Sequence, residues 1–178
     1  MHNILVLPSR DVLPDRNFVK NCAAIINVSD TPCSTFEHGV PSFWFPINEL
    51  GDWGYAPFFG ALRVLQRYEE PDGRPVIIHC HAGVHRSMSV ALALQLSCGH
   101  KPEDIELKPY TGRVVRDGFC PHSLFQRSMK VGHIPDDVVA MLVTAKQHPD
   151  YSLLGCLCQY GSPGANIRAL TECGDAAP

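Results

Sequence analysis

A cysteine and an arginine six positions apart carry the most suggestive chemistry in this sequence. Cys80 and Arg86 lie in the stretch 79–87, which reads HCHAGVHRS and follows a run typical of a buried strand. A loop from the carboxyl end of a strand into a helix directs backbone N–H groups and the helix dipole at one point. That point binds an anion and favours a cysteine thiolate. The guanidinium of Arg86 matches two phosphate oxygens, so the spacing predicts a reactive thiolate beside a bound oxyanion.

Two further residues of this stretch fit the same chemistry. Ser87 can form a hydrogen bond with the Cys80 thiolate and stabilise it when it leaves a covalent intermediate. Gly83 permits a backbone conformation or a close approach that a side chain would obstruct.

The elements that must position this loop can be predicted from hydrophobic periodicity. Short β-branched or aromatic runs predict strands at 3–7, 23–28, 42–45 and 75–79. Helical patterns cover 57–70, 87–97, 121–131 and 135–148. The pattern at 87–97 is apolar nearly all round, which is typical of a buried helix. This alternation predicts one α/β domain whose central, mainly parallel sheet of four to five strands is flanked by helices.

Length and composition limit the remaining possibilities. The 178 residues are 45% hydrophobic and 19% charged, as expected for one globular domain. We place that domain at 1–148 and interpret 149–178, which has Gly, Pro and Ser without periodicity, as a tail or cap. The net charge of −3 argues against nucleic-acid binding driven by bulk charge. No apolar run approaches the roughly 20 residues of a membrane span.

The eight cysteines form no C-x-x-C pair, which disfavours a structural zinc site. Without a recognisable secretion signal, we expect reduced thiols in an intracellular compartment. A second cysteine could still capture an oxidised Cys80 as a disulfide, and the sequence does not indicate which one.

The stretch 79–87 resembles the H-C-x5-R-S/T signature of cysteine-dependent phosphatases, and its H-C-x-A-G-x-x-R-S form resembles their dual-specificity branch. Residues 25–30 resemble the second-strand segment of that branch, and 45–47 resemble the strand that enters its acid loop. Residues 114–119 resemble the segment that leads into its later helices. The resemblance covers roughly residues 3–148 and implies a protein-tyrosine-phosphatase-like fold.

The resemblance also implies a role for each residue of the loop. Cys80 would attack phosphorus and form a cysteinyl-phosphate, while His79 orients the loop and tunes the thiol through hydrogen bonds. The phosphate oxygens would be held by Arg86 and by the loop backbone, which comprises His81, Ala82, Gly83, Val84, His85 and Arg86. The side chains of His81 and His85 are expected at the rim of the site. No metal or cofactor is implied, because Arg86 and the backbone dipoles supply positive charge.

The leaving oxygen needs a proton, and two carboxylates qualify as its donor. Asp52 has the residue type that this family uses and is flanked by Gly51 and Gly54. Glu49 instead falls where the P-I-x-D pattern of the family has its aspartate. We favour Asp52 narrowly and keep Glu49 as the alternative.

The implied substrate is a protein phosphorylated on Tyr and on Ser or Thr. The chain has no room for the added loop that deepens the pocket of tyrosine-specific relatives. A phosphoinositide phosphatase is a less favoured alternative, because such enzymes usually have lysines in this loop and this chain has none there. An RNA 5′-triphosphatase is also disfavoured, because such enzymes tend to need a basic surface and this chain has a net charge of −3. Two alternatives outside this activity are a catalytically dead phosphate-binding module and a rhodanese-type sulfurtransferase.

Overall fold

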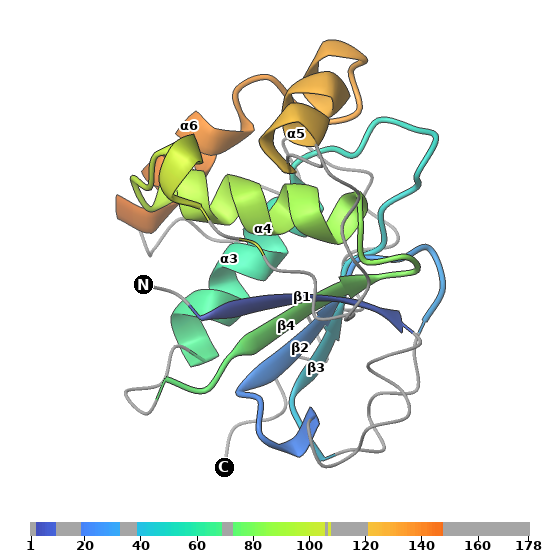
Figure 1. Ribbon diagram of the computed structural model, residues 1–178, viewed down its shortest axis with the longest axis vertical. Coiled ribbons are helices and arrows are strands. Elements are labelled where there is room, and N and C mark those ends of the chain that lie inside the picture. Colours follow the sequence, from blue (N-terminus) through green and yellow to red (C-terminus); the bar gives the residue numbers. More distant parts are fainter. Residues whose placement is uncertain are drawn as a thin grey trace.

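The protein is described by a computed structural model that covers residues 3–9, 19–32, 39–68, 73–105, 107 and 121–147. Within these ranges the chain forms a parallel sheet with helices packed against it (Figure 1). The expected tail at 149–178 and the segment 114–119 lie outside the described residues.

In the described part of the chain, four strands build the sheet, namely β1 (Ile4–Pro8), β2 (Ala24–Asn27), β3 (Ser42–Trp44) and β4 (Val76–Cys80). They lie in the order β1-β4-β2-β3, and every neighbouring pair is parallel. The α/β class with a mainly parallel sheet, predicted from the sequence, is therefore confirmed. Because parallel strands share one carboxyl edge, Cys80 pairs with Pro8 of β1, and His79 pairs with Asn27 of β2.

The central strand β4 is buried along its whole length. Successive side chains of a strand point to opposite faces, so Ile78 and Cys80 share one face and Ile77 and His79 share the other. Ile78 and Cys80 belong to the large core beneath the helices, whereas Ile77 belongs to a smaller core on the opposite face. The strand therefore directs the Cys80 side chain toward the helices.

Of the helices in the described ranges, α3 (Ala56–Tyr68) and α4 (Arg86–Ser97) pack on one face of the sheet, as Figure 1 shows. The helices α5 (Pro121–Lys130) and α6 (Val138–Gln147) pack on α4, on its side away from the sheet. In α4 every residue except Leu96 is buried, as the apolar pattern predicted. A single 3-10 turn (Pro102–Asp104), which was not predicted, follows α4. None of the helices in the described ranges has the length and apolarity needed to cross a bilayer.

The helix predicted at 135–148 starts later than expected. The Val138 amide donates to the Pro135 carbonyl at 3.1 Å, and the first helical bond runs from Met141 to the Asp137 carbonyl at 2.9 Å. Pro135 thus opens a tight turn, and Asp137 precedes the first residue of α6 instead of lying in its first turn. The Asp137 carboxylate also accepts a hydrogen bond from the Tyr55 hydroxyl.

The close approach of α3 to the segment after β3 gives a first testable prediction. A Cβ atom on Gly60 would lie 2.5 Å from the buried Phe45 ring. Gly60→Ala should therefore lower the unfolding free energy in urea by about 1–3 kcal/mol through overpacking. The same substitution made in a Phe45→Leu background should cost much less. Equal losses in both backgrounds would contradict the proposed clash.

Candidate active site

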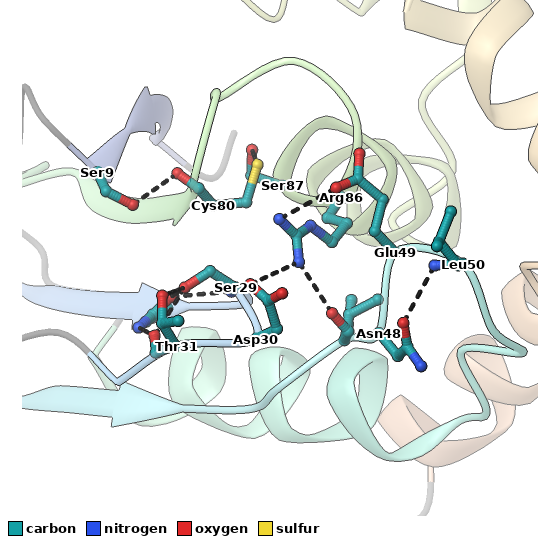
Figure 2. A network of polar contacts seen from close by, with 12 residues as sticks. Ser9, Ser29, Asp30, Thr31, Asn48, Glu49, Leu50, Cys80, Arg86 and Ser87 are labelled. Carbon is teal, nitrogen blue, oxygen red and sulfur yellow. Dashed lines mark hydrogen bonds and ion pairs between the residues drawn. The ribbon is translucent and has the colours of Figure 1, made fainter.

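Cys80 is the last residue of β4, and α4 begins six positions later at Arg86. The Cys80 side chain is buried, and its Sγ lies 3.2 Å from the Ser87 Oγ in the first turn of α4 (Figure 2). The structure therefore brings together the thiol and the hydroxyl that the sequence analysis selected. Both lie where the first amides and the positive dipole end of a buried helix are expected to stabilise negative charge.

The loop between β4 and α4 rests on the end of β1. Gly83 has φ +68°, and a Cβ atom there would lie 2.5 Å from the Pro8 nitrogen and 2.7 Å from the Leu7 carbonyl carbon. Both observations explain why this position needs glycine. Ser9 adds two hydrogen bonds, from its amide to the His81 carbonyl at 3.3 Å and from its hydroxyl to the Cys80 carbonyl at 2.9 Å. Ser9 was not predicted, because nothing in the sequence indicates that β1 adjoins this loop.

His79, which directly precedes Cys80 in β4, is fully buried. Burial lowers the pKa of its imidazole from 6.5 to about 4, and a hydrogen bond with the Cys80 backbone opposes this shift only in part. Its Nδ1 also lies 3.4 Å from the Ser9 Oγ. His79 is therefore neutral at pH 7 and can act on Cys80 through hydrogen bonding and packing, but not through a positive charge.

The Arg86 side chain is buried and is held by two segments that follow neighbouring strands. Its Nη1 donates to the Ile47 carbonyl at 3.0 Å and to Asp30 Oδ1 at 3.2 Å, and its Nη2 lies 3.5 Å from Glu49 Oε2. Figure 2 shows the guanidinium among these oxygens, close to Cys80. These contacts fix the orientation of the planar guanidinium in the site.

Asp30 is a site residue that the sequence analysis missed. The hydrogen bond from Arg86 is the main reason why the pKa of the Asp30 carboxyl is lowered. The turn that carries Asp30 is held by Asn27, whose side-chain oxygen accepts hydrogen bonds from the Ser29 amide at 2.8 Å and hydroxyl at 2.7 Å. A polar run directly after a buried strand was the available signal, since such runs often lie at the carboxyl edge of a parallel sheet.

The two candidate acids lie in different surroundings. Glu49 belongs to a turn in which Asn48 Oδ1 accepts a hydrogen bond from the Leu50 amide at 3.1 Å, and its carboxylate reaches Arg86 (Figure 2). The exposed Asp52 instead has its Oδ1 3.9 Å from the position that a Cβ on Gly132 would take, beside the turn after α5. Of the two candidate acids, Glu49 is therefore the one that lies beside Arg86, whereas Asp52 lies beside the turn after α5.

The variable residues of the loop divide into two groups. The side chains of His81, Ala82 and Val84 are exposed. His85 is only half-exposed and contacts residues of other segments.

No protein-family model matches the chain, and no curated protein matches it significantly. Among solved structures it is similar to DUSP15, with 12% identity, a TM-score of 0.48 and coverage of 89% of this chain and 90% of that one. It is also similar to Tk-PTP in its active form (16%, TM-score 0.44, coverage 81% and 90%). A third similar structure is the Yvh1 phosphatase domain from Chaetomium thermophilum (14%, TM-score 0.45, coverage 85% and 95%). Because these values are low, the functional argument rests on the residues of this chain.

The buried His79 predicts how stability depends on pH. The unfolded chain should protonate this imidazole below about pH 6.5, whereas the folded chain should resist protonation until about pH 4. The contribution of His79 to the unfolding free energy is therefore complete above about pH 6.5. It decreases as the pH falls toward 4, by about 3 kcal/mol in total. Urea titrations should show a shallower pH dependence for His79→Gln than for the wild type. Superimposable slopes would show that His79 is not held neutral.

Proposed function

We propose that the chain is a cysteine-dependent phosphomonoester hydrolase that acts on phosphorylated proteins. One observation carries the proposal: the Cys80 thiol lies 3.2 Å from the Ser87 hydroxyl in the loop that also bears Arg86, whose buried guanidinium is held by Asp30 and Glu49. A nucleophile, a group that stabilises its anion and a fixed cation are the components that transfer of a phosphoryl group to sulfur requires.

In the first step, the Cys80 thiolate attacks phosphorus, so that an S–P bond forms while the ester P–O bond breaks. Arg86 and the amides of loop 81–86 stabilise the negative charge on the equatorial oxygens. The departing oxygen takes a proton from Glu49 and leaves as an alcohol or phenol.

In the second step, water attacks phosphorus and transfers a proton to the Glu49 carboxylate, while the S–P bond breaks and phosphate is released. The Ser87 hydroxyl stabilises the departing thiolate, since its Oγ already lies within hydrogen-bond distance of Cys80 Sγ. Both steps use the same side chains, and the second regenerates Cys80 and Glu49 in their starting forms.

The charges around Arg86 favour a protein monoester over more highly phosphorylated ligands. The carboxylates of Asp30 and Glu49 pair with the guanidinium, and their side chains are 63% and 55% exposed to solvent. Further phosphates of a phosphoinositide or of an RNA 5′-triphosphate would meet this negative charge. The same exposure of Glu49 fits a shallow opening that admits phospho-Ser and phospho-Thr as well as phospho-Tyr. A reducing, intracellular compartment fits a thiolate nucleophile.

Metal-free hydrolysis of para-nitrophenyl phosphate tests the proposal directly. The wild type should turn over this substrate, and Cys80→Ser should abolish turnover because a serine hydroxyl is a far poorer nucleophile at neutral pH. Phosphate or vanadate binding should persist in that variant, since Arg86 and the loop amides remain. Cys98→Ser, at the far end of α4, is the matched control and should retain activity. Turnover by pure Cys80→Ser would exclude the cysteine mechanism.

The choice of acid can be tested by two amide variants. Glu49→Gln should lower kcat on phenyl phosphate by roughly 100-fold or more, and by less on para-nitrophenyl phosphate, whose leaving group hardly needs a proton. Asp52→Asn should have a small effect on both substrates, because Asp52 lies beside Gly132. The opposite pattern would assign the acid role to Asp52, and two mild variants would place the acid elsewhere.

A further inference from the structure

The imidazole of His85 points into the protein, although it belongs to the loop proposed to bind phosphate. Its Nε2 lies 2.6 Å from the Ser128 Oγ of α5, and its ring centroid lies 5.1 Å from that of Trp53. The His133 ring stacks on Trp53 at 6.1 Å and lies 6.5 Å from His85. We call these four residues, Trp53, His85, Ser128 and His133, the His85 cluster.

The His85 cluster connects three segments that are distant in the sequence. Trp53 is buried, and its amide donates to the His133 carbonyl at 2.8 Å. The Ser128 side chain is also buried, and the Ser128 carbonyl accepts a hydrogen bond from the His133 amide at 2.8 Å. The turn after α5 therefore holds the Trp53 backbone through a hydrogen bond, and α5 itself supplies the Ser128 hydroxyl that bonds to the His85 imidazole.

Two consecutive residues of the loop thus hold both ends of the segment 47–53. Arg86 binds its first residue through the Ile47 carbonyl at 3.0 Å, and His85 packs on its last residue, Trp53. Glu49 lies between these two contacts and is the proposed acid. Fixing both ends of a short segment restricts the positions that a side chain within it can reach.

Charge favours the neutral form of His85 in this role. Burial is the main cause that lowers the pKa of its imidazole, and electrostatic interactions with His133, Arg86 and Arg127 lower it further. Among the groups facing His85, Glu49 has the opposite effect and raises this pKa. A neutral imidazole can hydrogen-bond to Ser128 and pack on the indole without adding a second cation beside Arg86.

We propose that His85 is a positioning residue: its imidazole, anchored on Ser128 and packed on Trp53, holds the segment 47–53 so that Glu49 stays over the phosphate-binding loop. This inference rests on the proposed function, because it assigns Glu49 the role of acid. It replaces the expectation that the His85 side chain lines the rim.

The dependence on the leaving group tests this role. His85→Ala should lower kcat on phenyl phosphate about tenfold by displacing the acid, with little change on para-nitrophenyl phosphate. His85→Gln, whose amide can still bond to Ser128, should recover much of the loss. The rate of Cys80 alkylation by iodoacetamide should not change. His122→Ala, a histidine variant elsewhere on α5, is the matched control and should behave like the wild type.

A double-mutant cycle separates this inference from the proposed function. In a Glu49→Gln background, His85→Ala should cause no further loss, because the acid that it positions is already absent. Equal losses on both substrates, or a full additional loss in the Glu49→Gln background, would overturn the positioning role while leaving the cysteine mechanism intact. Absence of any metal-free turnover by the wild type would refute the proposed function instead.

Fluorescence provides a test that does not depend on turnover. The chain has two tryptophans, so Trp44→Phe leaves Trp53 as the only indole. If His85 holds Trp53 in place, His85→Ala in this background should shift the Trp53 emission to longer wavelength and increase its quenching by acrylamide. His122→Ala should change neither quantity. Unchanged emission and quenching in His85→Ala would overturn the inference whatever the activity.

Discussion

The buried guanidinium of Arg86 is the group on which the organisation of the site depends. A cation removed from water is strongly destabilising unless oxygen atoms replace the lost hydration. Here they come from Asp30 after β2 and from Ile47 and Glu49 after β3. The loop after β2 and the loop after β3, which are separate in the sequence, therefore meet at one point at the carboxyl edge of the sheet. The position of the proposed acid follows from the need to pair this one charge.

The same side chains also set the net charge around the Cys80 loop. Asp30 and Glu49 together outweigh Arg86 by one negative charge when both are ionised. Because the buried His79 is neutral, the positive charge near Cys80 comes from Arg86 and from the backbone dipoles. The groups proposed to bind phosphate and to donate the proton thus belong to one small group of charges.

The remaining support of the loop is mechanical. The end of β1 lies directly under Gly83, and Ser9 hydrogen-bonds to the loop from the same side. On the other side, the His85 cluster and the Ile47 carbonyl connect the loop to the segment that bears Glu49. A loop fixed from two sides can keep its backbone amides directed at one point before any ligand binds, which is the preorganisation that electrostatic stabilisation of a transition state requires.

The sequence by itself determined the strand–loop–helix unit with Cys80, Gly83, Arg86 and Ser87, because these residues are neighbours along the chain and their spacing has a direct structural meaning. It also determined the parallel α/β class, since buried strands alternate with helices. Only the tertiary structure decided what surrounds that unit. Asp30 contacts Arg86, from which it is separated by 56 positions in the sequence. The separation is 43 positions for Ser128 and His85, and 71 positions for Ser9 and Cys80. Hydrophobic periodicity predicts which face of an element is buried, but not which distant loop packs beside it. It therefore could not show that Glu49 lies beside Arg86 and Asp52 beside Gly132.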